Sequence, residues 1–167
     1  METQQRQSFA LNYVVNLLSR REYSEFELRC KLQEKAYSEN EIEYAIGKCQ
    51  ERHWQSDHRF TENYLRARSQ RGYGLKRIHQ ELTQLKGVQE STISEVLVEM
   101  EEENAINWQA IALNVLRKKF PFFQESLTPK QKQKIWQYMF SHGFNTDEFS
   151  VFIGMSDEEI SDYFSEW

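Results

Sequence analysis

The chain has 167 residues and carries 21 Lys and Arg against 26 Asp and Glu, a net charge of −5. This length fits one ordinary domain or a short array of small repeats, and the charge excludes a uniformly basic coat protein. Only six Gly and two Pro interrupt the sequence, which argues against turn-rich sandwiches and barrels and against disordered linkers and leaves long helices.

Three sets of apolar stripes follow one another along the chain. In each stripe the apolar residues recur every three or four positions, the spacing of a helix face that packs on a core. The first set comprises Ala10, Val14 and Leu17, then Leu28 and Leu32, then Ile42, Ala45, Ile46 and Cys49. The second comprises Phe60, Tyr64 and Ala67, then Ile78, Leu82 and Leu85, then Ile93, Val96, Leu97 and Met100. The third comprises Trp108, Ile111 and Val115, then Ile135 and Met139, then Phe149, Phe152 and Ile153.

Capping residues mark where several of these helices begin. A Ser followed three residues later by Glu predicts a capping box, in which the hydroxyl accepts from an amide and the acid reaches back. The expected caps are Ser24 with Glu27, Ser38 with Glu41, Asp57, Asn107, Thr128 with Pro129 at the first helical position, and Ser156 with Glu159.

Corresponding positions such as Leu28, Ile78 and Ile135 recur about 50 to 57 residues apart. The order of the stripes therefore predicts an all-α fold, an elongated, curved array of three tandem three-helix repeats plus a short C-terminal helix. We expect the repeats at 8–56, 57–106 and 107–155, and the tail helix at 156–167. The tail carries an apolar face, and seven acids lie between Asp147 and Glu166. It either packs on the third repeat as a cap or folds over a basic groove as an acidic mimic of DNA.

Charge alternates along the second and third sets. Asp57 to Lys86 holds seven basic residues against three acids, and the following Glu90 to Glu103 holds six Glu and no basic residue. Arg117 to Lys134 again holds six basic residues against one acid, and seven acids follow it. Stacked repeats would turn this alternation into a basic stripe beside an acidic one, which suits a partner that presents both phosphates and protein surface. The alternative is a mixed surface charge that serves only solubility.

One stretch resembles a known family. It comprises Asp57-His-Arg-Phe60, Tyr64, Arg68, Gly72-Tyr-Gly74, Arg77-Ile78, Glu81-Leu82 and Lys86-Gly87. This pattern is similar to the signature of the RecX family, regulatory proteins that bind and restrain the recombinase RecA, and the resemblance extends from about residue 10 to about 155. The chain departs from the family pattern at Gln55, at Ala36, and in the segment from Leu82 to Gly87, which is one residue longer.

The resemblance implies tandem three-helix repeats that lie along the groove of the RecA–DNA filament and suppress ATP hydrolysis and strand exchange. It thereby implies a regulator of homologous recombination, DNA repair and the SOS response. The expected partners are the RecA filament and single- or double-stranded DNA reached through it, and the protein is expected to act as a monomer. The basic clusters give the candidate contact residues Arg59, Arg66, Arg68, Arg71, Lys76, Arg77, Arg117, Lys118, Lys119, Lys130, Lys132 and Lys134.

Catalytic, cofactor and metal sites are not expected. The sequence has no GxGxxG, no Walker loop, no GxSxG and no HExxH, and its four histidines are scattered. Cys49 and His53 are four residues apart with His58 nearby, but no CxxC or HxxxH pair accompanies them, so a buried Cys49 is preferred to a metal ligand. The absence of an apolar run of membrane-spanning length, the polar N-terminus and the two cysteines place the protein in the cytoplasm.

Three other readings compete with the RecA regulator. A helical-repeat adaptor that binds only protein would show little salt dependence, and an independent helix-turn-helix module would require sequence preference. An enzyme is the weakest of the three. The arginines around Gly72 and Gly74 form the best contact candidate, although Gly72 alone is explained equally well as a helix stop. Aromatic residues at 120–123, 136, 138 and 140 could stack on nucleobases, but more often such residues fill a core.

Overall fold

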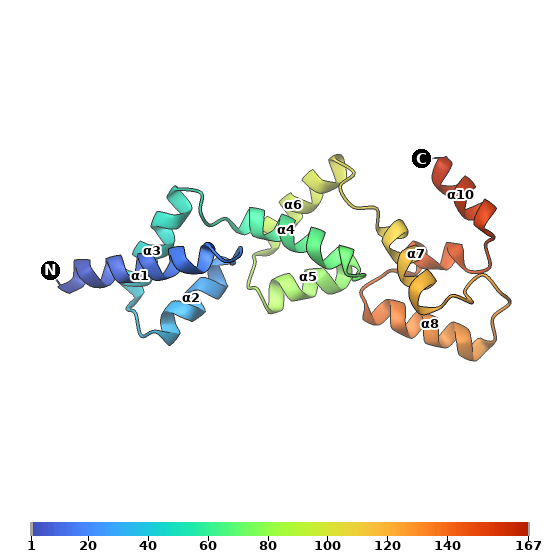
Figure 1. Cartoon of the computed structure of the whole chain (residues 1–167), viewed down its shortest axis with the longest axis horizontal. Coiled ribbons are helices and arrows are strands. Elements are labelled where there is room, and N and C mark those ends of the chain that lie inside the picture. The colour runs from blue at the N-terminus through green and yellow to red at the C-terminus, as the bar shows by residue number, and fades with distance from the viewer. Residues whose placement is uncertain (1, 167) are drawn as a thin grey trace. The chain divides into compact units, whose positions relative to one another are not determined.

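The computed structural model describes residues 2–166, and every regular element in this range is helical (Figure 1). The first set is α1 (Glu2–Leu18), α2 (Glu25–Glu34) and α3 (Glu39–Glu51). The second is α4 (Asp57–Gln70), α5 (Leu75–Gln84) and α6 (Glu90–Glu102). The third is α7 (Trp108–Lys119), α8 (Pro129–Ser141) and α9 (Thr146–Phe149) with the 3₁₀ turn η1 (Ser150–Phe152), and α10 (Asp157–Ser165) follows. The predicted all-α fold of three tandem three-helix sets and a terminal helix is confirmed, whereas the repeat boundaries and the elongated shape stay predictions.

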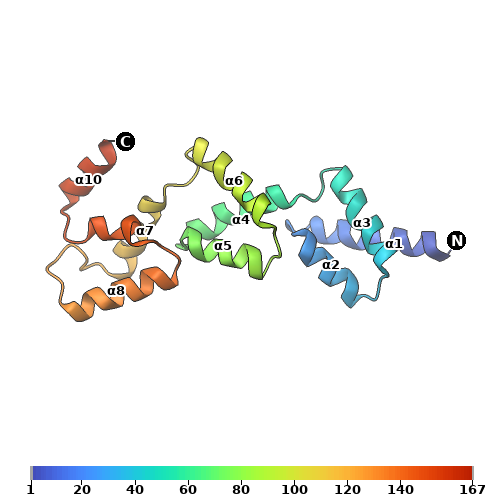
Figure 2. The ribbon, with the colours of Figure 1, turned by 180° about the vertical axis from the view of Figure 1, so that it is seen from behind.

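The described chain packs as two compact units, and the second set contributes to both. The first unit comprises the described residues up to Tyr64 together with Gln80–Glu102. The second comprises Leu65–His79 together with the described residues from Glu103 onward. Helix α4 thus begins in the first unit and ends in the second, and α5 runs the opposite way. Figure 2 shows the helices of the second unit, α7, α8 and α10, from behind.

A residue in the left-handed region of backbone conformation follows the second helix of each set. These residues are Ala36, Gly87 and Gly143, with φ of 60°, 63° and 94°. After α2 the amide of Tyr37 donates to the carbonyl of Leu32, a Schellman-type stop, and Phe144 donates to Met139 in the same way after α8. After α5 the corresponding bond runs from Val88 to Leu82, one residue longer. The longer segment noted in the sequence is therefore accommodated as a wider turn.

Three of the predicted core stripes are wrong in part. Leu85 is 63% exposed because the wider turn after α5 carries it off the buried face. On α4, Ala67 is exposed, and the buried face includes the polar residues Thr61 and Ser69. Apolar spacing alone therefore did not identify this face. On α7 the fully packed residues are Ala112, Leu113 and Leu116, whereas Trp108, Ile111 and Val115 are half-buried.

Most predicted caps are confirmed, and one is wrong. Ser38, Thr128 and Ser156 form complete capping boxes, and Asn107 caps α7. Ser24 caps α2, but Glu27 does not reach back, since its carboxylate pairs with basic side chains instead. Asp57 does not cap its own helix: the hydroxyl and carbonyl of Ser56 accept from the amides of Arg59 and Phe60. Its carboxylate instead accepts a hydrogen bond from an amide of α2.

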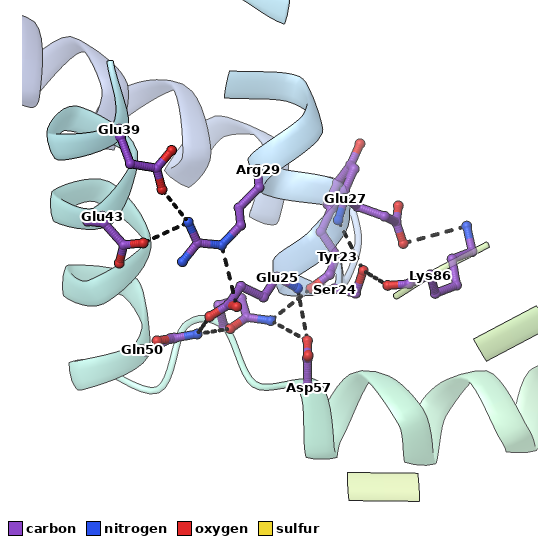
Figure 3. Close-up of polar contacts among 11 residues, drawn as sticks. Tyr23, Ser24, Glu25, Glu27, Arg29, Glu39, Glu43, Gln50, Asp57 and Lys86 are labelled. Atoms are coloured by element: carbon purple, nitrogen blue, oxygen red, sulfur yellow. Dashed lines mark hydrogen bonds and ion pairs between the residues drawn. The ribbon is translucent and has the colours of Figure 1, made fainter. Parts of the chain in front are cut away.

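The first joint is the contact, within the first unit, between the start of α2 and the α5–α6 turn together with Asp57 (Figure 3). The Ser24 hydroxyl donates to the Lys86 carbonyl at 2.7 Å, and Lys86 Nζ lies 3.5 Å from the Glu27 carboxylate. Asp57 Oδ1 accepts from the Glu25 amide at 2.8 Å, so it satisfies a free donor in the first turn of α2. Side chains thus make most of the first joint.

Gln55 is a polar residue at a position where the resemblance implies an aliphatic one, and its hydrogen bonds explain how it is accommodated. Its side chain is only 2% exposed, yet both ends of its amide are satisfied. The nitrogen donates to Asp57 Oδ1 at 2.9 Å and to the Tyr23 carbonyl at 3.3 Å, and the oxygen accepts from Gln50. Burial raises the pKa of Asp57, and the hydrogen bonds from Glu25 and Gln55 oppose that rise.

The tail helix α10 packs on the third set. Ile160 is buried in the core of that set, and the Phe152 ring lies 5.5 Å from the Tyr163 ring and 5.7 Å from the Phe164 ring. The Tyr163 hydroxyl donates to Gln109 on α7 at 3.0 Å. These contacts match the cap interpretation, while Trp167, which the sequence places on the same face, lies outside the described residues.

Candidate functional site

The second joint is the contact, within the second unit, between the α4–α5 turn with the start of α5 and the α8–α9 turn. Gly74 donates its amide to the His142 carbonyl at 2.6 Å, and Lys76 donates its amide to the Gly143 carbonyl at 3.2 Å. A Cβ added to Gly74 would overlap the backbone of Gly143. Glycine is therefore required because two backbones touch here, and the joint is made by main chain.

An aromatic stack lies beside this backbone contact. The rings of Tyr73 and His142 have centroids 5.3 Å apart at an interplanar angle of 9°, and the rings of His142 and Tyr138 are 3.9 Å apart at 21°. His142 Nδ1 lies 2.9 Å from the Tyr138 carbonyl oxygen, so the ring is held against its own helix. The guanidinium groups of Arg68 and Arg77 lie 4.0 Å and 4.9 Å from the Tyr73 ring centroid, within cation–π range.

The basic groove is an open hollow of about 500 Å³ bounded by the stack, the end of α4 and one face of α7. Arg71, Lys118 and Lys119 supply its positive charge, and among the described residues that line it none is acidic. Its remaining lining residues are Ser69, Gln70, Gly72, Tyr73, Ile111, Asn114, Val115, Tyr138 and His142. Cations gathered without a compensating acid raise the local positive potential, and a groove focuses that potential on an incoming anion.

The structure brings together residues from both predicted basic clusters. Arg71 comes from the first cluster, at the turn after α4, and Lys118 and Lys119 come from the second, in the last turn of α7. Arg68 and Arg77 do not line the groove but lie against the ring of Tyr73, which does, and Arg77 also donates to the Ser141 carbonyl at 3.0 Å. The arginine–glycine turn proposed as the best contact candidate is thus one side of the groove.

The seven remaining candidates do not line the groove either. Arg59 is committed to the first unit, where it pairs with Glu22 at 2.7 Å and donates to the carbonyls of His53 and Trp54. Arg66 lies 4.0 Å from Glu103, and Arg117 lies 4.0 Å from Asp157. The exposed candidates on α5 and α8 are Lys76, Lys130, Lys132 and Lys134.

Sequence reasoning missed several groove residues. His142, Asn114 and Gln70 have no motif of their own, and Tyr73 entered only as part of the Gly72-Tyr-Gly74 pattern. A signal existed in the repeat alignment, because Gly74 and Gly143 hold positions equivalent to Ser24 and Gly87 in the first joint. Among the predicted aromatic residues, Tyr138 lines the groove, whereas Phe120 and Phe123 are core.

Within residues 2–166, no group of three or more His, Cys, Asp or Glu side chains is placed to hold a metal ion. Cys49 lies in the apolar core, where burial raises the pKa of its thiol, and His58 pairs with Glu99 at 2.8 Å. Over the same residues, no helix has both the length and the apolar character needed to span a membrane.

Comparison with known proteins gives the same family in all three sets. Models of the first, second and third three-helix domains of RecX match residues 10–49, 56–97 and 107–152. A regulatory protein RecX from Haemophilus influenzae (strain PittEE) is 61% identical over 152 residues, which cover 91% of this chain and 97% of the relative.

Two solved structures share the fold. A crystal structure of regulatory protein RecX has a TM-score of 0.76 at 23% identity over 90% of this chain and 74% of its own. A crystal structure of RecX from Lactobacillus salivarius has a TM-score of 0.75 at 20% identity over 90% of this chain and 96% of its own.

Proposed function

Because the chain belongs to the RecX family of regulatory proteins, we propose that it is a non-catalytic inhibitor of the recombinase RecA. In this proposal it acts in the cytoplasm as a monomer, binds the RecA–DNA filament along its groove, and suppresses ATP hydrolysis and strand exchange. It thereby limits homologous recombination and the SOS response. The observation that carries the proposal is the ordered match of all three domain models, supported by 61% identity to a regulatory protein RecX.

The basic groove supports a contact with the DNA-bearing filament. Arg71, Lys118 and Lys119 gather on one hollow in a chain whose net charge is negative, so this positive region is local rather than general. A nucleic-acid backbone attracts such a region, and the gain from released counterions makes the affinity depend steeply on salt. Acidic surfaces elsewhere would keep the protein from coating DNA unspecifically.

Co-sedimentation with RecA filaments tests the proposal directly. We expect the protein to pellet with RecA assembled on DNA, to pellet less without DNA, and to lower the rate of DNA-dependent ATP hydrolysis. Repeating the assay at several salt concentrations should give log affinity that falls linearly with log salt. Binding that depends on neither DNA nor salt concentration would instead favour an adaptor that contacts only protein. ATP hydrolysis by the protein alone would contradict a non-catalytic role.

A further inference from the structure

We propose that the basic groove holds one nucleotide of a single-stranded nucleic acid, with the phosphate on its cations and the base on its apolar floor. This inference rests on the proposed function, because it names the ligand of the same groove. It goes further in assigning direct nucleic-acid contact to this chain without RecA.

The face of α7 in the groove changes chemistry along its length. Ile111, Asn114, Val115 and Lys118 are spaced by three and four residues, so they lie on one side of the helix. The apolar pair comes first, and the cation follows at the C-terminal end, about 10 Å further along by the rise of an α-helix. That length suits a nucleotide laid along the helix with its base near Ile111 and its phosphate near Lys118.

The opposite wall supplies matching groups. Arg71, from the turn after α4, adds to the same groove a guanidinium, which can bind phosphate through two parallel hydrogen bonds. Gln70 and Asn114 are exposed amides, one on each wall, and an amide can both donate to and accept from the edge of a base. The volume of about 500 Å³ is within the usual range of small-ligand sites.

The walls are fixed before any ligand arrives. Gly74 and Lys76 bond to consecutive carbonyls at His142 and Gly143, and Tyr73 stacks on His142. A site whose walls are already ordered loses little further conformational entropy on binding. The exposed lysines of α8, by contrast, do not line this groove.

A strand is favoured over two other anionic ligands. A free nucleoside triphosphate is usually held by a glycine-rich loop that opens a helix, and the sequence contains no such motif. An acidic peptide would use the cations but would leave the apolar floor and the paired amides without partners. A single strand exposes both phosphates and unstacked bases.

The test is binding of the full chain, without RecA, to a fluorescent oligo-dT strand by anisotropy. The groove variant carries Arg71→Gln, Lys118→Gln and Lys119→Gln, and the control carries Arg20→Gln, Lys35→Gln and Arg52→Gln, which are exposed in the first unit. We expect the groove variant to bind on the order of tenfold more weakly, with a salt slope lower by about 2, since each contact contributes about 0.7 on single strands. The control should bind like the unmodified protein.

An abasic strand of the same length separates base from phosphate recognition. We expect weaker binding to the abasic strand, and a Gln70→Ala, Asn114→Ala variant should show a smaller preference for the strand with bases while keeping its affinity for the abasic strand. Unchanged oligo-dT affinity in the groove variant, equal affinity for both strands, or stronger competition by ATP or polyglutamate than by unlabelled dT would each overturn the inference. The proposed function would survive any of these results if the unmodified protein still inhibits RecA.

Discussion

The two joints occupy equivalent positions in the repeats, but side chains make the first and main-chain groups make the second. In both, the start of a middle helix meets the turn that follows the middle helix of the next set. At the first joint, the Ser24 side chain bonds to the Lys86 carbonyl and Asp57 caps the neighbouring helix. At the second joint, Gly74 stands in the place of Ser24, and its own amide bonds to the His142 carbonyl.

This difference explains why the basic groove lies at the second joint and not at the first. A hollow of about 270 Å³ also lies at the first joint, but its lining includes the acids Glu25 and Asp57. Its Arg29 is paired with glutamates, so this hollow does not attract an external anion. Glycine at the second joint removes side chains from the contact itself, so the nearby Arg71, Lys118 and Lys119 stay available around a hollow. Close backbone packing therefore provides both the rigidity and the open surface of the basic groove.

Replacing Gly74 should produce the largest effect on stability. In Gly74→Ala the new Cβ meets the main chain of Gly143, which cannot rotate away, so we expect a loss of about 3 kcal/mol or more. At the first joint Gly87→Ala should also destabilise the protein, because the new Cβ would lie 2.5 Å from Phe26 Cβ, which rotation of that side chain does not move. The matched change without a clash is Gly154→Ala, where φ is 82° and no atom lies within 4 Å of the added Cβ, so it should cost only about 1–2 kcal/mol from its positive φ.

Chemical unfolding of the Gly74 and Gly154 variants measures this difference. Gly47→Ala is the control, because a Cβ there meets no atom within 4 Å and alanine favours the α3 helix. A loss at Gly74 no larger than that at Gly154 would show that the backbone contact does not stabilise the second joint.

Removing the tail should have the next largest effect. Deleting 156–167 exposes the surface of the third set that α10 covers, and the lost burial of Ile160 alone corresponds to about 2 kcal/mol. We expect a lower unfolding temperature, measured by thermal scanning, and more aggregation, measured by light scattering. Unchanged stability combined with tighter filament binding would instead identify the tail as an acidic mimic of DNA.

Asp57 should matter through its acceptor oxygen. Asp57→Ala leaves the Glu25 amide without its acceptor and the Gln55 amide nitrogen with only the Tyr23 carbonyl, and we expect a loss of about 2 kcal/mol in chemical unfolding. Asp57→Asn keeps an oxygen in the same place and should cost much less. A similar loss in both variants would show that the charge, rather than the hydrogen bonds, stabilises the first joint.

The pH dependence of stability gives a sharper test of the same residue. Burial raises the pKa of Asp57 in the folded protein, so just above the ordinary aspartate pKa of about 3.9 the unfolded chain holds fewer protons than the folded one. The stability contributed by protonated Asp57 is present below that value and is lost as the pH rises through the folded pKa. Asp57→Asn should remove this fall.

The difference between the two proteins isolates that contribution. Arg6 lowers the pKa of Glu41, which makes stability rise with pH in the acid range, but this effect is common to both proteins and cancels. Unfolding free energies measured from about pH 3 to pH 7 should therefore favour the Asn variant increasingly as the pH rises. Parallel curves would contradict the assignment.

The smallest expected effect is a gain at Ala36. This residue holds the left-handed position that glycine holds at Gly87 and Gly143, so Ala36→Gly should stabilise the protein by about 1 kcal/mol. The reverse change at Gly154, where φ is 82° and no atom lies within 4 Å of an added Cβ, should cost a similar amount. Thermal unfolding of both variants shows whether the cost of alanine at a left-handed position is the same at 36 and 154.

The helices and their order were predictable because they depend on local sequence. Ser38 and Thr128 fix helix starts through their own side chains, and Leu28, Ile78 and Ile135 mark equivalent buried positions in the three sets. The α4 face was not predictable from apolar spacing, because Thr61 and Ser69 are buried there. Asp57 looked like a local cap because sequence gives no indication of which helix a carboxylate will reach.

The basic groove was only half predictable. Charge clustering identified Arg71, Lys118 and Lys119, but it could not separate them from Arg59, which is neutralised within the fold by Glu22. The stack of Tyr73 on His142 joins residues 69 positions apart and depends on the glycine contact beside it. Such pairings follow from tertiary packing, which no local pattern encodes.

The central claim is that the basic groove of the second joint is where the protein contacts the DNA-bearing filament. The most direct test compares inhibition of RecA ATP hydrolysis by two charge-reversed proteins at one salt concentration. One carries Arg71→Glu, Lys118→Glu and Lys119→Glu, and the other carries Arg20→Glu, Lys35→Glu and Arg52→Glu in the first unit. We expect the first to need at least tenfold more protein for half-maximal inhibition, about 1.4 kcal/mol, and the second to match the unmodified chain. Equal inhibition by both would contradict the claim.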